Sequence, residues 1–161
     1  MRYFNPVGAS KECNIGENSF NKTNIMPMIL LSASKKINFL EIYGDSYNTK
    51  DGTASRDYIH VSDLAKAHVQ SLYYKKNKYD VFNIGTGVSH TIMDLVNTFK
   101  KVNNIEIPFK FSKKREGDLP YSCAAIKKAK KDLKWEAIFS LEDMCKDAWN
   151  WYKSPKSILN D

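Results

Sequence analysis

The sequence has 161 residues, which is enough for one domain with a hydrophobic core and too short for two full domains. Hydrophobic residues make up 42% and aromatic residues 12%, which is typical of a folded chain and not of a disordered one. The sequence contains neither an apolar run of roughly 18 residues, as a membrane helix needs, nor the apolar stretch of a signal peptide. We therefore expect a single cytoplasmic domain over residues 1–161 with no membrane contact.

The net charge is +7, and 22 of the 25 basic residues are lysines. Lysine and asparagine are abundant, as an AT-rich genome would produce, so part of the net charge carries no functional meaning. A basic chain nevertheless favours anionic partners such as nucleotides, phosphates or nucleic acid. Arg2, Arg56 and Arg115 are more informative, because the arginine fork binds phosphate oxygens through two hydrogen bonds. The alternative is that these arginines persist by chance. Lysine runs are typical of solvated surfaces, so nucleic-acid binding is not expected.

The three cysteines are odd in number and far apart in the chain. They form neither a Cys-x-x-Cys pair nor a cluster with histidine, so we expect no disulfide framework and no metal site. A reducing cytosol suits this cysteine pattern best. The cysteines are Cys13, Cys123 and Cys145.

Strands alternate with helices along the predicted chain, which indicates an α/β fold. Two capping boxes, Thr91 with Asp94 and Ser140 with Asp143, mark the starts of two helices. Ser62 is the predicted N-cap of a third helix. The predicted strands are 1–8 (turning at Asn5-Pro6), 39–43, 58–61, 79–84 and 105–111; the predicted helices are 25–36, 63–74, 91–101, 126–134 and 141–152; and the predicted loops or turns are 9–24, 44–53, 85–87 and 115–120.

Some motifs invite a functional interpretation that their context does not favour. Gly85-x-Gly87-x-x-His90 follows a strand, but histidine replaces the third glycine of a dinucleotide-binding loop, so a plain strand-to-helix turn is favoured. Tyr74…Lys78 and Tyr152…Lys156 match Tyr-x-x-x-Lys, a spacing that a lysine-rich chain produces by chance, and the second match contains Pro155. His60 and His68 are predicted to be buried and hydrogen-bonded, the latter on the apolar face of its helix with Leu64, Ala67 and Leu72.

Four segments taken together resemble the UDP-glucose 4-epimerase family of extended short-chain dehydrogenase/reductases. They are Arg2-Tyr3-Phe4-Asn5-Pro6-Val7-Gly8, Thr49-Lys50-Asp51-Gly52-Thr53 with Arg56-Asp57-Tyr58-Ile59-His60-Val61, Phe82-Asn83-Ile84-Gly85-Thr86-Gly87, and Arg115-Glu116-Gly117-Asp118. The resemblance spans residues 1–152 and implies a Rossmann-type fold, NAD, a nucleotide-sugar substrate, a role in galactose metabolism and a homodimer.

The resemblance covers only the C-terminal half of that family. The glycine-rich cofactor loop and the Ser…Tyr-x-x-x-Lys catalytic set are absent from the sequence. Met1 stands where the family has an apolar residue inside a strand. We therefore expect a fragment, the product of a split gene or that of a decayed gene, which is inactive alone and carries no catalytic residue. A partner chain with the N-terminal half is a further expectation.

The resemblance also implies a substrate site, position by position. Phe4 matches a residue near the NAD nicotinamide, and Asn5 a contact to the sugar or its phosphate. The remaining matches are Asn24 and Ile25 at a helix start near the diphosphate, Glu41, Ile42 and Tyr43 along the uracil, Arg56 and Arg115 on the diphosphate, Asp118 on the ribose, and Ser122 beside the sugar's C2 substituent. An ion pair between Arg115 and Asp118 is the alternative for these loop charges.

Two positions differ from the pattern of many relatives, and two alternative functions remain open. Ala125 stands where many relatives have aspartate, and a small residue at Ser122 resembles family members that also accept N-acetylhexosamines. One rival function is half of a related nucleotide-sugar epimerase or dehydratase, such as one that acts on UDP-N-acetylhexosamines, because the segments at 56–61 and 115–118 resemble more than one activity of the superfamily. The other is a basic binding protein or remnant without enzymatic activity.

Overall fold

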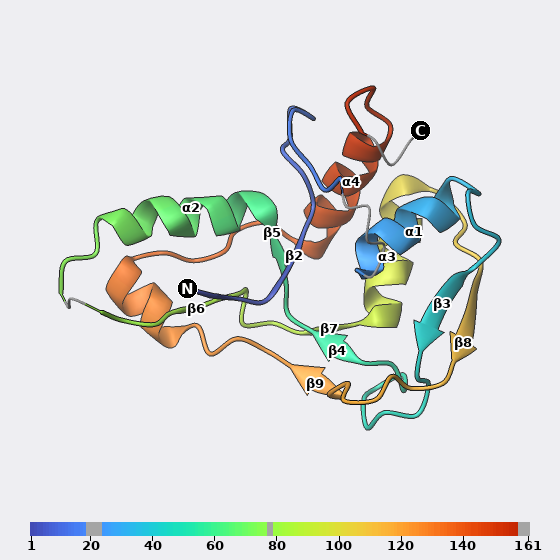
Figure 1. The fold of residues 1–161 in the computed structure, drawn as a ribbon, viewed down its shortest axis with the longest axis horizontal. Helices are drawn as coiled ribbons and strands as arrows, with labels where there is room; N and C mark the ends of the chain where they lie inside the picture. Colours follow the sequence, from blue (N-terminus) through green and yellow to red (C-terminus); the bar gives the residue numbers. More distant parts are fainter. Residues whose placement is uncertain (19–23, 77–78, 158–161) are drawn as a thin grey trace.

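A computed structural model of the chain describes residues 1–18, 24–76 and 79–157. Helices α1, α3 and α4 gather beside the β3–β8 strand pair, and α2 lies at the other end of the molecule with β1 and β6 (Figure 1). The elements are β1 (Arg2–Tyr3), β2 (Asn5–Val7), α1 (Ile25–Ala33), β3 (Leu40–Tyr43), β4 (Ser55–Arg56), β5 (Tyr58–His60), α2 (Val61–Leu72), β6 (Asn83–Ile84), β7 (His90–Thr91), α3 (Ile92–Asn103), β8 (Phe109–Ser112), β9 (Tyr121–Ser122), the π-helical η1 (Ala129–Leu133) and α4 (Leu141–Tyr152).

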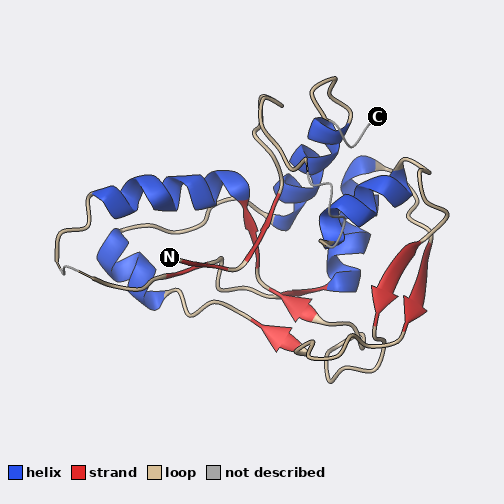
Figure 2. Ribbon diagram, in the orientation of Figure 1, coloured by secondary structure: helices blue, strands red, loops and turns tan. Residues whose placement is uncertain are grey.

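The described strands are short and pair across long stretches of sequence, as Figure 2 shows in red. Three parallel pairs form, β1–β6, β2–β5 and β3–β8, beside a three-stranded sheet in the order β7–β4–β9. Asn5 lies opposite Tyr58 in the β2–β5 pair. Arg56 of β4 lies opposite Ser122 of β9. This pairing brings the predicted site residues of three distant segments to the middle of the molecule.

Two hydrophobic clusters hold these elements together. The larger one joins α1, α3 and α4 to the inner face of β3, and Phe99, Leu40 and Met144 are buried in it. The smaller one lies between α2, β6 and η1, and it buries Ile84 and Trp135. Burial of apolar side chains is the main stabilising contribution to folding, so each cluster fixes its own group of helices.

Both predicted capping boxes are present. Thr91 accepts the backbone N–H of Asp94 at 3.0 Å, and the Asp94 carboxylate accepts the Thr91 N–H at 3.0 Å. Ser140 and Asp143 make the same reciprocal pair at the start of α4. The predictions for α3 and α4 are therefore confirmed within two residues, and α4 ends at Tyr152 as expected.

The other helices begin or end away from their predicted bounds. The N-cap of α2 is His60 and not Ser62, because the His60 imidazole Nδ1 accepts the Ser62 N–H at 3.0 Å. α2 therefore begins at Val61 instead of residue 63. α1 ends at Ala33 instead of residue 36, since Lys35 adopts a left-handed conformation with φ of 61°. The predicted helix 126–134 has its regular π-helical part at Ala129–Leu133.

The strands are shorter than predicted because their partners are short. β6 pairs with β1, which has only two residues, so the strand expected at 79–84 contracts to Asn83–Ile84. β8 forms at Phe109–Ser112 and not at 105–111, because it is in register with the four residues of β3. The 1–8 segment splits into β1 and β2, which pair with different strands.

The prediction that His60 and His68 are both buried is half right. His60 is fully buried, whereas His68 is exposed, with its Nε2 2.8 Å from the Tyr3 hydroxyl. Leu72, predicted on the same apolar face, is 78% exposed. Residues 19–23 of the predicted 9–24 loop, and Lys78 of the Tyr74…Lys78 motif, lie outside the described residues. Among the helices that the structure describes, none has the length and apolar character needed to cross a membrane.

Candidate functional site

Three adjoining cavities run through the middle of the molecule, and together they are lined by all eleven residues that the sequence predicts for the site. The cavity at one end measures about 120 Å³ and contains Glu41, Ile42 and Tyr43 in its wall. The central cavity, of about 240 Å³, shares Asn24, Ile25 and Arg115 with it. The cavity at the other end, of about 620 Å³, shares Phe4, Asn5 and Arg56 with the central one and adds Asp118 and Ser122.

Arg56 lies between the central and the largest cavity. One terminal nitrogen of its guanidinium donates to the backbone oxygens of Ser55 at 2.9 Å and Leu119 at 2.7 Å. The other lies 3.7 Å from the Asp118 carboxylate. Arg56 therefore fixes the 115–120 loop against β4, and the ion pair of this loop is Arg56 with Asp118, not Arg115 with Asp118 as the alternative interpretation proposed.

Arg115 lies at the opposite side of the site, over an aromatic face. Its guanidinium carbon is 3.9 Å from the centre of the Tyr43 ring, which is a cation–π arrangement. The Tyr43 hydroxyl donates to Glu41 at 2.8 Å, and Lys110 lies 3.2 Å from the same carboxylate. The Tyr43 hydroxyl, with Lys110, lowers the pKa of Glu41, so this carboxylate stays ionised beside the ring.

The start of α1 faces the central cavity. Asn24 occupies the N-cap position, but its side chain donates to Glu17 at 3.0 Å and caps no backbone N–H group of the helix. Ile25 is the first helical residue, and both residues line the cavity. The unpaired N–H groups in the first turn of a helix favour anions. This helix start and the two arginines surround one anion-compatible space.

Asp57 organises the polypeptide behind the site. Its buried carboxylate accepts the N–H groups of Thr86 at 2.8 Å, Gly87 at 2.9 Å and Ala124 at 3.1 Å. A Cβ atom at Gly85 would lie 2.6 Å from that carboxylate, which explains the glycine. The Gly85-Thr86-Gly87 segment is thus a turn around a carboxylate of the protein itself, as the favoured interpretation has it, and not a phosphate-binding loop.

Sequence reasoning missed several residues of the site. Tyr58 lines the central cavity from β5, and its buried hydroxyl has no hydrogen-bond partner among the described residues. Ile92 and Met28 line the cavity beside Tyr43. Tyr58 belongs to the motif that carries Arg56, so the motif itself was the available signal. The sequence contains no such signal for Ile92 and Met28, because an apolar residue in a helix has the same sequence pattern whether it lies in the core or lines a binding site.

The fold agrees with comparisons to known proteins. The sequence matches the family described as GDP-mannose 4,6 dehydratase over residues 1–148, and the chain belongs to this family. Within it, the chain is the C-terminal half of an extended short-chain dehydrogenase/reductase with a Rossmann-type fold, as the sequence predicts.

The similar proteins are more specific. The chain is 43% identical to UDP-glucose 4-epimerase of Bacillus subtilis over 157 residues, which are 96% of this chain and 46% of that protein. A solved epimerase from Bifidobacterium longum in complex with NAD+ and UDP is 36% identical with a TM-score of 0.90, over 94% of this chain and 46% of that one. The Stenotrophomonas maltophila epimerase, with bound NAD and a formylated UDP-arabinopyranose, is 39% identical with a TM-score of 0.89, over 93% and 46%. The chain thus spans about half the length of its relatives.

Proposed function

We propose that the chain is the C-terminal, substrate-binding portion of a UDP-glucose 4-epimerase, and that the three adjoining cavities hold the UDP-sugar. The observation that carries this proposal is that eleven residues from separate segments line three adjoining cavities that share residues with one another. An aromatic face stands at one end, two arginines in the middle and a roomy polar cavity at the other. The B. longum relative, solved with UDP, supports this assignment.

Each part of the ligand then has its own group of side chains. The uracil stacks on Tyr43, beside Glu41 and Ile42, once Arg115 leaves the ring face. Arg56 and Arg115 bind the diphosphate together with the start of α1 at Asn24 and Ile25. The resemblance assigns the ribose hydroxyls to the Asp118 carboxylate, which in this structure lines the largest of the three cavities beside Arg56. Asn5 and Ser122 lie beside the sugar.

The cofactor of this site is NAD, which the solved relatives contain. Phe4 and Tyr3 line the largest cavity and fit the nicotinamide end, but the 161 residues hold no further NAD-binding motif. The chemistry that NAD would supply here is the acceptance and return of the hydride at the sugar's C4 carbon. This chain's own residues bind and orient the UDP-sugar. The proton-transferring tyrosine and its lysine belong to the N-terminal half of the family enzyme, so the chain alone is inactive. The complete enzyme is a homodimer that acts in galactose metabolism in the cytoplasm.

Titration calorimetry with UDP tests the proposal. Arg115→Lys keeps the charge and loses the fork, so it weakens UDP measurably, and Arg56→Ala weakens it further. Asp118→Ala removes the preference for UDP over inorganic diphosphate. Equal UDP affinity in these variants and the parent chain would contradict the proposal. Salt-dependent binding of nucleic acid without UDP binding would favour the non-enzymatic rival.

Ser122 supports a second candidate substrate. Its small, half-buried side chain lines the 620 Å³ cavity at the sugar end. That space suits an N-acetylhexosamine as well as a hexose. We expect UDP-N-acetylglucosamine to bind about as well as UDP-glucose, and Ser122→Tyr to reject the former selectively. Rejection of UDP-N-acetylglucosamine by the parent chain would remove this candidate.

A further inference from the structure

Glu17 is the one acidic residue among the described residues that line the central cavity of the candidate site. Arg56 and Arg115 line the same cavity. A carboxylate beside two arginines weakens the attraction of this space for an anion such as a diphosphate, because like charges repel. Glu17 is therefore electrostatically unfavourable for the proposed ligand, and its position in the cavity wall needs another explanation.

The fold holds Glu17 in this position through its backbone. The indole Nε1 of Trp151 in α4 donates to the Glu17 carbonyl oxygen at 3.1 Å. A Cβ atom at Gly16 would lie 2.4 Å from the Trp151 ring, so glycine lets the chain pack closely against α4. Gly16 also forms an antiparallel bridge with Ala9, just beyond the end of β2. The packing of this loop on α4 therefore fixes where the Glu17 side chain begins.

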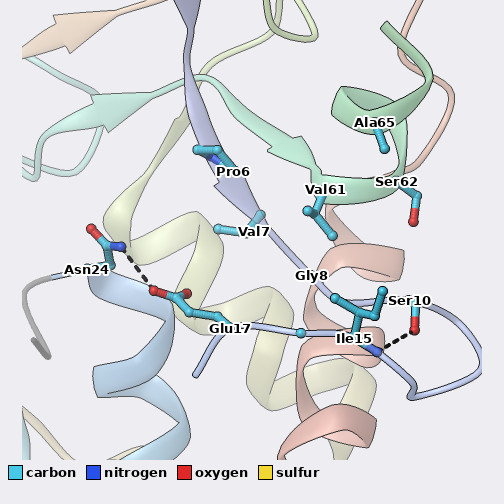
Figure 3. A pocket seen from close by; sticks show the side chains of 11 residues that line it. Pro6, Val7, Gly8, Ser10, Ile15, Glu17, Asn24, Val61, Ser62 and Ala65 are labelled. Atoms are coloured by element: carbon cyan, nitrogen blue, oxygen red, sulfur yellow. Dashed lines mark hydrogen bonds between the residues drawn. The ribbon is translucent and has the colours of Figure 1, made fainter. Parts of the chain in front are cut away.

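The Glu17 carboxylate binds the side chain of Asn24, the N-cap residue of α1. Asn24 Nδ2 donates to Glu17 Oε1 at 3.0 Å, as the dashed line in Figure 3 shows. An N-cap asparagine normally turns its side-chain oxygen to the N–H group of the second or third helical residue. The third residue here is Pro27, which has no N–H group, so a cap could reach only Met26. With its amide bound to Glu17, Asn24 makes no such cap.

The first turn of α1 therefore presents uncapped N–H groups at the central cavity. Ile25 and Met26 line that cavity, and their N–H groups have no acceptor within the helix. The capping boxes of α3 and α4, by contrast, occupy two of the first donors of each helix. Tyr58 lines the same cavity and is 1% exposed, and its hydroxyl has no hydrogen-bond partner among the described residues. Donors of this kind from two elements around one cavity indicate a place for an anionic ligand.

We infer that Glu17 is a positioning residue for the diphosphate of the nucleotide sugar: it holds the Asn24 side chain away from the start of α1, so that the N–H groups of the first turn bind phosphate oxygens. The inference rests on the proposed function and adds a residue that the sequence did not predict for the site. Glu17 acts through Asn24, and its carboxylate makes no bond to the ligand. The gain in geometry outweighs the repulsion between the carboxylate and the diphosphate.

Substitutions at Glu17 test the inference in the full chain of 161 residues. Glu17→Ala, Glu17→Gln and Asn24→Ala are compared with the double variant Glu17→Ala/Asn24→Ala. Glu12→Ala is the matched control, because Glu12 lies exposed in the same loop and lines none of the three cavities of the site. Titration calorimetry measures the affinity of each variant for UDP, and thermal unfolding is measured without ligand.

Removal of the charge and loss of the positioning change the UDP affinity in opposite directions. We expect Glu17→Ala to lower the affinity by roughly 5- to 20-fold, because the released Asn24 side chain caps Met26 and takes a donor that the diphosphate uses. The new cap raises the unfolding temperature by about 1–3 °C. Glu17→Gln keeps an acceptor for Asn24 and recovers most of the lost affinity. In the Asn24→Ala background Glu17→Ala no longer lowers the affinity, and Glu12→Ala alters neither quantity in the parent chain.

Three results would overturn the inference. An affinity of Glu17→Ala at or above the parent's would show that Glu17 contributes only its repulsive charge. An equal loss in the Asn24→Ala background would mean that Glu17 acts on UDP without Asn24. A loss that comes with a lower unfolding temperature and that Glu17→Gln does not recover would indicate a purely structural role. A parent chain that binds no UDP refutes the proposed function and the inference with it, whereas weak binding by Arg56→Ala with parent-like binding by Glu17→Ala refutes the inference alone.

Discussion

Replacing Asp57 should affect both stability and nucleotide binding, because its carboxylate joins three segments. It accepts the N–H groups of Thr86, Gly87 and Ala124 and the Thr86 hydroxyl at 2.7 Å, and it is completely buried. Asp57 follows Arg56, and Ala124 comes two residues after Ser122. The carboxylate therefore holds two site segments on one turn.

The structure gives the size of the expected loss. A buried N–H group without a partner costs about 1–3 kcal/mol, and removing one member of a buried polar arrangement costs about 3–5 kcal/mol. Asp57→Ala leaves three such N–H groups, so we expect a loss of about 3–5 kcal/mol in the free energy of unfolding. Asp57→Asn retains one acceptor oxygen but turns an amide NH₂ toward two donors, so its expected loss is about 2–3 kcal/mol. Glu106→Gln, at a side chain that is 87% exposed, should stay within about 0.5 kcal/mol.

Urea unfolding measures these losses, and a second measurement separates a general loss of stability from a loss of site geometry. Leu95→Ala in the larger cluster costs about 2–5 kcal/mol, and Leu95 lines none of the three cavities of the site, so this variant serves as an equally destabilised control. Under conditions where both variants are folded, UDP should bind more weakly to Asp57→Asn than to Leu95→Ala. An Asp57→Asn variant with the parent's stability or the parent's UDP affinity would refute the reasoning.

Three further predictions concern single elements. Burial lowers the pKa of His60, so the folded state keeps a neutral ring; stability should fall as the pH drops below about 6.5, and urea midpoints of His60→Asn should lack that fall. Tyr58→Phe removes a buried hydroxyl without a partner among the described residues and should raise the free energy of unfolding by about 1 kcal/mol, whereas an equal decrease would reveal a missed hydrogen bond. Thr91→Ala removes the α3 capping box and should cost about 1–2 kcal/mol in thermal unfolding; no change would contradict the cap.

Helix starts with local signals could be predicted from the sequence. The capping boxes at Thr91 and Ser140 are made within four residues, so the sequence contains all their partners. The start of α2 depends on an imidazole that caps the helix from a strand, and His60 is not a usual N-cap residue. Strand lengths depend on partners about 70–80 residues away, such as β1 for β6 and β3 for β8. A local sequence pattern therefore cannot predict how long each of these strands is.

The candidate site could be predicted because its residues lie in recognisable motifs. Arg56, Arg115 and Asp118 belong to the segments that carry the family resemblance. Their present contacts were not predictable in the same way. The carbonyl of Leu119 as a partner of Arg56, and the Tyr43 ring as a partner of Arg115, follow from how the 115–120 loop packs.

The two sides of α2 show the limit of hydrophobic periodicity more sharply than any loop. Periodicity reports that Ala67 and Leu72 are apolar at helical spacing, and it predicts core for both. It says nothing of which polypeptide supplies that core. Ala67 is buried by this chain, whereas Leu72 is 78% exposed. The prediction of core at Leu72 is therefore wrong for the described chain, because the periodicity of apolar residues does not distinguish a packed side of a helix from an exposed one.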